Sequence, residues 1–141
     1  MVVVFGDEPE SGTYDIKRTN SYDGYGIGRL GFSDHRMGLF TTAFHLAMKN
    51  DARIYGDKGM ILIENPWFGR PGDKLTLIRE GQDPEEFSLG CTGDELYAYE
   101  ADVVGESLAA GLLESNHMSI EDTLGNMRAI DMMKASAGLE F

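Results

Sequence analysis

The chain has 141 residues, with 24 Asp and Glu against 12 Lys and Arg, which gives a formal net charge of −12. This length fits one domain with a core of its own, and a content of 42% hydrophobic and 26% charged residues excludes wholesale disorder. The acidic balance argues against binding to nucleic-acid phosphates or to an anionic membrane, and the single cysteine, Cys91, excludes an internal disulfide framework and a thiolate metal cluster.

The first two thirds of the sequence predicts short β-strands joined by turns. The opening Met1–Glu8 has the pattern of an interior strand with a methionine at its front, which suggests a piece of a longer protein. The apolar run of this segment is Val2–Phe5. Further strand patterns follow at Thr13–Thr19, Met37–Met48, Ala52–Tyr55, Met60–Ile63, Leu75–Ile78 and Glu86–Leu89. Gly56–Gly59 carries the Gly/Asp signal of a hairpin turn. Because the turns are short, we expect a mainly antiparallel sheet.

The last third predicts two helices. Thr92, with Glu95 three positions later, has the pattern of a capping box. The apolar stripe that follows it at helical spacing comprises Tyr97, Ala101, Val104, Leu108 and Leu112. Ser119 offers a second cap with acidic residues behind it, and Gly138 is placed to end this helix in a left-handed conformation. The second apolar stripe comprises Ile120, Leu124, Met127, Ile130, Met133 and Ala137.

Strands followed by helices predict an α+β fold, an open and mainly antiparallel sheet with helices on one face. Met60–Ile63 is apolar on both sides, although a sheet covered on one face should alternate more cleanly. Two helices cannot cover both faces, so we expect something outside this chain to cover the second one.

The Gly-rich segment Gly24–Gly31 resembles a linker more than any other part of the chain. Within it, Gly26-Ile27-Gly28-Arg29-Leu30-Gly31 matches the dinucleotide-binding fingerprint by its letters. That fingerprint requires a buried strand before it and a helix beginning inside it, because the phosphates lie on the helix N-terminus. The preceding residues are polar and the following ones predict turn and strand, so we expect a flexible loop or a bulged strand instead.

No catalytic or metal-binding set stands out. His35, His45 and His117 lie far apart, and none has a His or Cys at ligand spacing. Many carboxylates occupy predicted turns or first helical turns, where solvation or capping explains them: Asp83, Glu85, Glu86, Glu121 and Asp122. A nucleophile elbow and a phosphate-binding lysine loop are both missing from the sequence. We therefore predict no catalytic, cofactor-binding or metal-binding residue in this chain.

The segment Asn65–Pro71 is the strongest candidate for a binding site. It follows a strand directly and places Trp67, Phe68 and Arg70 on a loop that contains two prolines. Rigid loops with aromatic side chains often form pocket walls, so these three residues are predicted to bind substrate. The alternative, at even odds, is a hydrophobic plug over the sheet end or an interface contact.

Several motifs in one order resemble the C-terminal domain of the glucose–fructose oxidoreductase and inositol dehydrogenase (Gfo/Idh/MocA) family. They are a Gly-x-x-Ala strand at 38–44, an a-x-I-x-G-x-x-G hairpin at 52–63, a helix over 99–115 that ends in Ala-Gly-x-x-Glu-Ser, Asp131, and the closing Gly138–Phe141. The resemblance covers most of Met37–Phe141. The Asn-Pro-Trp-Phe loop is most similar to that of the dihydrodiol and xylose dehydrogenase-like members.

The resemblance implies an NAD(P)-dependent oxidoreductase that acts on a sugar, polyol or diol by hydride transfer. In that family an N-terminal Rossmann domain holds NAD or NADP, and a Glu-Lys-Pro motif supplies the catalytic lysine; both are missing from this sequence. Residues 1–141 would then be one substrate-binding and oligomerisation domain, inactive alone, that works with the missing Rossmann domain. A homodimer through the open sheet face is expected as well.

The main alternative is a non-enzymatic, stand-alone α+β module that binds a ligand or partner through the Trp67 loop. Neither hypothesis calls for nucleic acid or membrane as a partner. No stretch approaches the ~20 apolar residues of a membrane span, and the first residues lack the basic region of a signal peptide. We therefore expect the protein in the cytoplasm.

Overall fold

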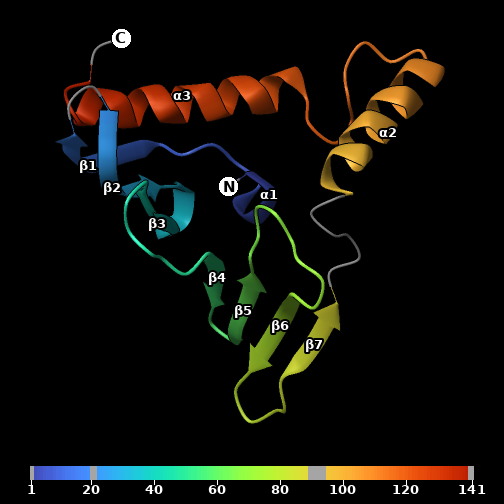
Figure 1. Ribbon diagram of the computed structural model, residues 1–141, viewed down its shortest axis with the longest axis horizontal. Helices are drawn as coiled ribbons and strands as arrows, with labels where there is room; N and C mark the ends of the chain where they lie inside the picture. Colours follow the sequence, from blue (N-terminus) through green and yellow to red (C-terminus); the bar gives the residue numbers. More distant parts are fainter. Residues whose placement is uncertain (1, 20–21, 89–94, 140–141) are drawn as a thin grey trace. The chain divides into compact units, whose positions relative to one another are not determined.

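The computed structural model describes residues 2–19, 22–88 and 95–139. The chain divides into two compact units, which are described one at a time: unit 1 comprises Met1–Met48 with Glu114–Phe141, and unit 2 comprises Lys49–Leu113. Figure 1 labels their helices and strands.

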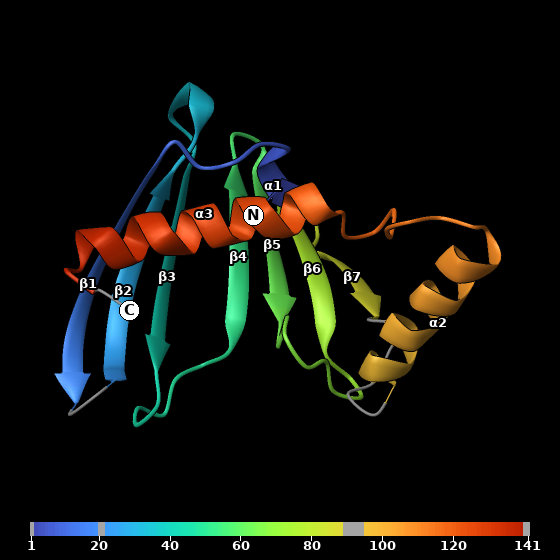
Figure 2. The same ribbon diagram turned by 90° about the horizontal axis from the view of Figure 1, so that it is seen from above.

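Unit 1 is a three-stranded antiparallel sheet with a helix on one face. The sheet has the order β1 (Ser11–Thr19), β2 (Tyr22–Gly31) and β3 (Met37–Ala43), and helix α3 (Ile120–Ser136) packs mainly on β1. Figure 2 shows α3 crossing these strands. Strand β3 ends at Ala43 and is shorter than the predicted Met37–Met48, and one further hydrogen bond, from the Phe44 amide to the Gly24 carbonyl, follows its last residue.

The first residues are not a strand, contrary to the prediction. Val2–Phe5 forms one short helical turn, α1. The segment is instead fixed by Arg36, which donates to the Phe5 carbonyl oxygen (2.7 Å) and to Asp7 Oδ2 (2.7 Å), and whose guanidinium lies 5.3 Å from the centroid of the Phe5 ring. The Phe5 ring lies 4.6 Å from that of Phe32, which is buried, so this turn closes one end of the small core.

The Gly-rich segment is the central strand β2, not a loop or linker. Its glycines make room for aromatic rings from both neighbouring strands. A Cβ on Gly26 would lie 2.5 Å from the ring of Tyr14, and one on Gly28 would overlap the ring of Phe40. The two rings stack over this glycine track with their centroids 6.0 Å apart. The predicted bulge is in this strand: Lys17 pairs with Tyr25 and Arg18 with Asp23, so Gly24 of β2 is the extra residue.

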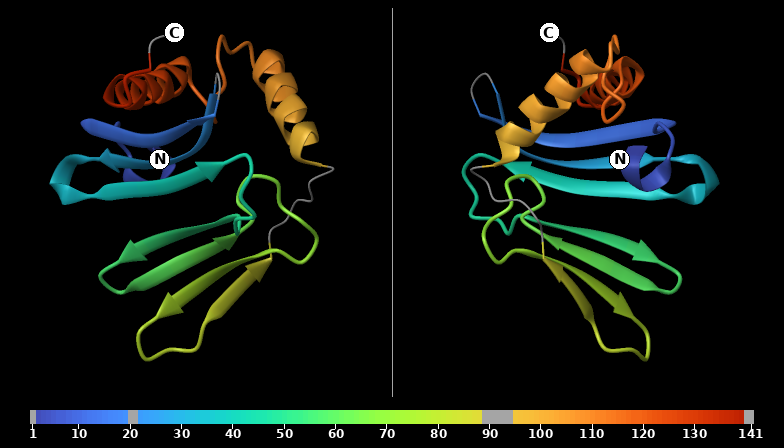
Figure 3. Two further views of the ribbon diagram at one scale, coloured as in Figure 1. Left: turned by 60° about the vertical axis from the view of Figure 1, so that its left-hand side comes forward. Right: turned by 90° about the vertical axis from the view of Figure 1, so that its right-hand side faces the viewer.

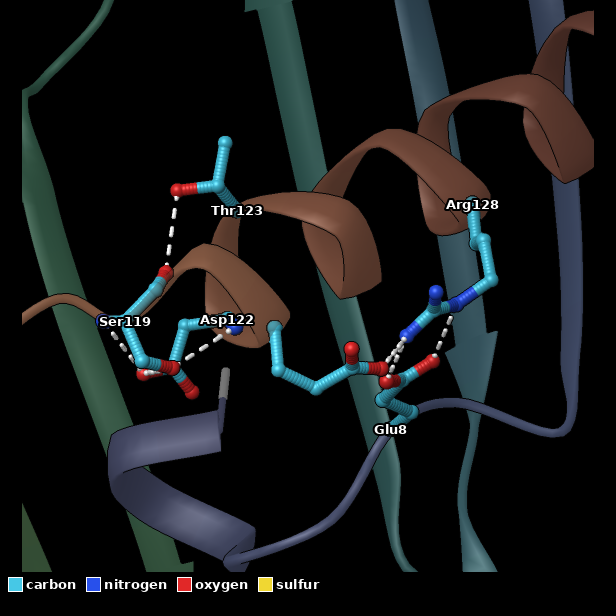
Figure 4. Close-up of polar contacts among 6 residues, drawn as sticks. Glu8, Ser119, Asp122, Thr123 and Arg128 are labelled. Carbon is cyan, nitrogen blue, oxygen red and sulfur yellow. Dashed lines mark hydrogen bonds and ion pairs between the residues drawn. The ribbon is translucent and has the colours of Figure 1, made fainter. Parts of the chain in front are cut away.

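Both ends of α3 carry the predicted signals. Ser119 is the N-cap, and its side chain and that of Asp122 form a reciprocal capping box (Figure 4). Hydrogen bonds from the Ser119 side chain and, to a smaller extent, from the Ser119 backbone amide hold the pKa of Asp122 below its ordinary value. At the other end, Gly138 has φ 64°, and the Leu139 amide donates to the Lys134 carbonyl, which completes a Schellman motif.

Helix α3 packs against the rest of unit 1 through a face that is not the predicted apolar stripe. Gly125 and Ala129 are buried, and Gly125 approaches the side chain of Glu8. Arg128 forms ion pairs with Glu8 and Glu121 beside this contact (Figure 4), and the hydrogen bond from Arg128 lowers the pKa of Glu8. Small residues let the helix approach closely, so most of the larger apolar residues point outward. The exposed members of the stripe are Ile120, Leu124, Met127 and Ile130.

Unit 2 contains a four-stranded antiparallel sheet in the order β4 (Asp51–Gly56), β5 (Gly59–Glu64), β6 (Lys74–Arg79) and β7 (Glu85–Ser88). The β4–β5 hairpin forms as predicted, with a two-residue loop at Asp57-Lys58. Figure 3 shows this hairpin and the β6–β7 hairpin. Glu85 and Glu86 do not lie in a turn as expected, but in β7, where they form ion pairs with Arg79 and Lys74.

Helix α2 (Leu96–Ala109) also belongs to unit 2. Thr92, the predicted cap, lies outside the described residues, and Glu95 occupies the N-cap position. The apolar residues Tyr97, Val104 and Leu108 are all exposed. Gly111 ends the helix at φ 69°, and the Leu112 amide donates to the Ser107 carbonyl in a second Schellman motif. The predicted α+β class with antiparallel strands is thus confirmed, with the strands divided between two sheets.

We predict that Gly28→Ala destabilises the chain by about 1–3 kcal/mol, because the new methyl group must displace the Phe40 ring. Gly105→Ala is the matched control, since a Cβ at this helical position meets nothing within 4 Å and should be neutral or slightly stabilising. Urea unfolding would measure both. The double variant Gly28→Ala, Phe40→Ala should lose less stability than the sum of its single changes; strict additivity would contradict the proposed overlap.

Candidate functional site

The predicted binding segment forms the loop between β5 and β6 in unit 2. Trp67 and Phe68 are 68% and 60% exposed, and Arg70 is exposed as well. Two large aromatic side chains in water within one short loop form an apolar patch, and such a patch on a loop indicates a contact surface. The structure therefore places all three predicted residues on one accessible segment, without showing what they bind.

Asn65 fixes the base of this loop. It is only 9% exposed and takes a left-handed backbone conformation, with φ 45°, that few residues other than glycine adopt. Its side-chain oxygen accepts a hydrogen bond from Asn50 Nδ2 (2.7 Å), and its Nδ2 donates to Asp73 Oδ2 (3.2 Å). Its carbonyl accepts the amides of Phe68 (3.3 Å) and Gly69 (3.1 Å). One buried amide thus links both ends of the loop with the segment before β4.

The second half of the loop is held by Asp73. Asp73 Oδ2 also accepts the backbone amide of Arg70 (2.5 Å), while the Asp73 amide donates back to the Arg70 carbonyl (3.0 Å). The Arg70 backbone is therefore fixed, and its side chain is directed by the loop into solvent. A cation next to two exposed rings suits a ligand with an apolar face and hydroxyl or carboxylate oxygens.

Strand β4, which lies beside the base of the loop, begins with the carboxylate of Asp51. Burial alone would raise the pKa of Asp51, but hydrogen bonds and charge from Arg53 and Lys49 outweigh it and hold this pKa below the ordinary value. Asp51 is thus an ionised partner of two cations, which is a structural role.

Three residues that determine the loop geometry were not identified as such from the sequence: Asn50, Asn65 and Asp73. The Asn-Pro pair at 65–66 was the only signal for a special turn.

The three histidines of the sequence all belong to unit 1. His45 bonds Tyr22 in unit 1, whereas His35 and His117 are exposed. Within residues 2–19, 22–88 and 95–139, no group of three or more His, Cys, Asp and Glu is arranged to hold a metal ion. No helix in this described part of the chain is long and apolar enough to cross a bilayer.

The glycine fingerprint does not fit a dinucleotide. Gly26 and Gly28 lie in a strand instead of at a helix N-terminus, and the rings of Tyr14 and Phe40 occupy the space above them. A pyrophosphate needs free backbone amides at the start of a helix. Gly26–Gly31 therefore offers no such cradle for NAD or NADP.

Comparison with solved structures shows a likeness in fold. The chain superimposes on the crystal structure of an aldose-aldose oxidoreductase from Caulobacter crescentus, complexed with glycerol, with a TM-score of 0.80 and 16% sequence identity. The match covers 97% of this chain but only 41% of the oxidoreductase chain. The fold is that of a part of this enzyme. No protein-family model matches the sequence, and no curated protein matches it either.

We predict that Asn65→Ala costs more stability than Asn65→Gly. Both variants lose the hydrogen bonds to Asn50 and Asp73, which should cost about 1–3 kcal/mol, but alanine also strains the left-handed backbone by about 1–2 kcal/mol. Urea unfolding gives the stabilities, and the fluorescence anisotropy of Trp67 reports the loop. Both variants should lower the anisotropy, and an exposed amide, Asn126→Ala, should not. Equal stabilities for the two Asn65 variants would contradict the strain.

Proposed function

We propose that this chain is the substrate-binding and oligomerisation domain of an NAD(P)-dependent oxidoreductase of the Gfo/Idh/MocA type. The observation that carries the proposal is the fold shared over 97% of the chain with less than half of an aldose-aldose oxidoreductase. The motifs at 38–63 and 99–115 support the same family from the sequence. The substrate would be a sugar, polyol or diol, and the cytoplasm is the expected location.

In this proposal the chain supplies binding and orientation. Trp67 and Phe68 would pack against the carbon skeleton of the substrate, and Arg70 would bond one of its oxygens. Their similarity to the loop of dihydrodiol and xylose dehydrogenase-like proteins supports this assignment. The nicotinamide cofactor accepts or delivers the hydride, and it would be held by a Rossmann domain outside residues 1–141. The described residues would bind and orient the substrate and would take no part in the hydride transfer.

Hydrogen bonds in the structure account for the residue spacing on which the resemblance rests after α2. Gly111 ends the helix, Glu114 Oε2 accepts the Ile120 amide at the start of α3 (2.7 Å), and Ser115 Oγ accepts the His117 amide (3.0 Å). The Gly-x-x-Glu-Ser motif is therefore a helix-to-helix connection. Its role is to set the entry of α3, which favours a structural reading of this motif over a catalytic one.

Homodimerisation would use the face of the β1–β3 sheet that α3 does not cover. On this face Ile27 pairs with Thr41 and Leu39 pairs with Arg29, so Ile27 and Leu39, which are 56% and 74% exposed, are diagonal neighbours. Tyr25 and Met37 lie further along the same two strands. A row of aliphatic and aromatic residues in water on adjacent strands is typical of an interface. Lys17, Arg29 and Asp15 on the same face could pair across a twofold axis.

We predict that neutral sugars or vicinal diols change the fluorescence of Trp67, the only tryptophan of the chain, whereas NADH does not bind. Phe68→Ala should weaken sugar binding by about tenfold, because one of the two exposed rings is lost. Tyr55→Ala removes a similarly exposed ring from β4 and is the matched control. Tight NADH binding by this chain would refute the proposal that a separate domain holds the cofactor. If no sugar or diol changes the Trp67 fluorescence, the alternative of a stand-alone binding module is favoured.

We predict that the chain is a dimer at micromolar concentration and that Leu39→Asp converts it into a monomer. The new carboxylate would have to be desolvated at the centre of the apolar face. Phe87→Asp, which changes an exposed apolar residue on β7 of the other sheet, is the control and should remain a dimer. Light scattering with circular dichroism separates dissociation from unfolding. A monomeric parent chain would contradict this interface.

A further inference from the structure

A cluster of aromatic and polar side chains lies at one end of the β1–β3 sheet, in unit 1 and apart from the Trp67 loop in the sequence. It is built where β2 begins and β3 ends, because the Phe44 amide donates to the Gly24 carbonyl (3.0 Å) and so continues the pairing beyond Ala43. The members of this cluster are Tyr14, Tyr22, Asp23, Thr42, Phe44 and His45.

The aromatic half of the cluster is open to solvent. The rings of Tyr22 and Phe44 meet edge to face, with centroids 5.5 Å apart and planes at 85°. Phe44 is nevertheless 74% exposed and Tyr22 is 39% exposed. A ring so exposed contributes little to the core, since hydrophobic stabilisation depends on the area removed from water. Its position against a second ring instead offers a firm apolar surface to a ligand.

The polar half presents hydrogen-bonding groups beside these rings. Tyr14 Oη donates to Asp23 Oδ2 (2.7 Å) and lies 3.0 Å from Thr42 Oγ1. Tyr22 Oη lies 2.7 Å from His45 Nε2. Burial and the bond to Asp23 raise the pKa of Tyr14, so its hydroxyl remains a neutral donor and acceptor. These bonds fix the orientation of a carboxylate, two phenols, a hydroxyl and an imidazole.

We propose that this cluster is a second binding site, for a neutral polyhydroxyl ligand such as a sugar or polyol. The apolar C–H face of such a ligand would lie on Phe44, and its hydroxyls would bond Asp23, Thr42 and His45. Alternating hydroxyl and C–H surfaces match a site that mixes aromatic faces with paired donors and acceptors. The carboxylate of Asp23 disfavours anionic ligands. The proposal rests on unit 1 contacts and does not depend on the oxidoreductase assignment.

The test is a titration of the full chain with D-glucose, followed by ¹⁵N–¹H spectra that resolve the Gly24 and Phe44 amides and the Trp67 indole. We expect saturable shifts of the two amides. Phe44→Ala should weaken the binding by about tenfold or more, and Tyr22→Phe, which removes only the hydroxyl that holds His45, by a smaller factor. Leu46→Ala, an exposed apolar change in the same segment, is the matched control and should bind as the parent does.

Three results would overturn this site: no saturable shift of the Gly24 and Phe44 amides, unchanged affinity in Phe44→Ala, or tighter binding of glucose 6-phosphate than of glucose. Trp67→Ala separates this proposal from the proposed function. If the amide shifts persist in that variant, the ligand binds the cluster independently of the loop. If they vanish there while the variant remains folded, the shifts originate at the loop and the second site is refuted.

Discussion

The main physical constraint on this chain is the large number of apolar side chains that remain exposed to solvent. Among the described residues the buried apolar side chains are Leu30, Phe32 and Ala129, all in unit 1. The accessible surface is 10627 Å², whereas even two separate domains of these sizes would expose only about 8,700 Å². The excess is more than twice the roughly 800 Å² that each partner buries in a standard protein interface. A chain of this kind gains full stability only when other surfaces cover it.

Local polar networks fix how the elements meet around this thin core. Arg36 fixes the first helical turn, Arg128 joins Glu8 to α3, and Ser119 with Asp122 starts that helix. Each network acts at the place where an element begins or where two segments distant in sequence meet. Exposed ion pairs of this type contribute little energy singly, because solvent screens them. Their main effect is to set which face of α3 meets the sheet, and this leaves its outward face apolar and available.

Signals that act within a few residues were predictable from the sequence, and signals that depend on tertiary contacts were not. The hairpin at Gly56–Gly59, the Ser119 cap and the left-handed Gly138 follow from local backbone chemistry. The role of Gly24–Gly31 did not, because it is decided by Tyr14 and Phe40 on neighbouring strands. For the same reason the buried face of α3 was missed: Gly125 and Ala129 are weakly hydrophobic, and their small size matters more than their hydrophobicity.

The candidate site shows the same division. Trp67, Phe68 and Arg70 could be proposed from the sequence because aromatic residues on a loop with two prolines are conspicuous, but Asn65, which fixes the loop, is one polar residue among many. The loop alone is one wall. A small-molecule site buries about 70–90% of its ligand, and rings that are themselves more than half exposed cover only one side of a sugar. In the proposed two-domain enzyme this chain would contribute a rigid, open wall of this kind, and the second domain would close the site and bring the cofactor.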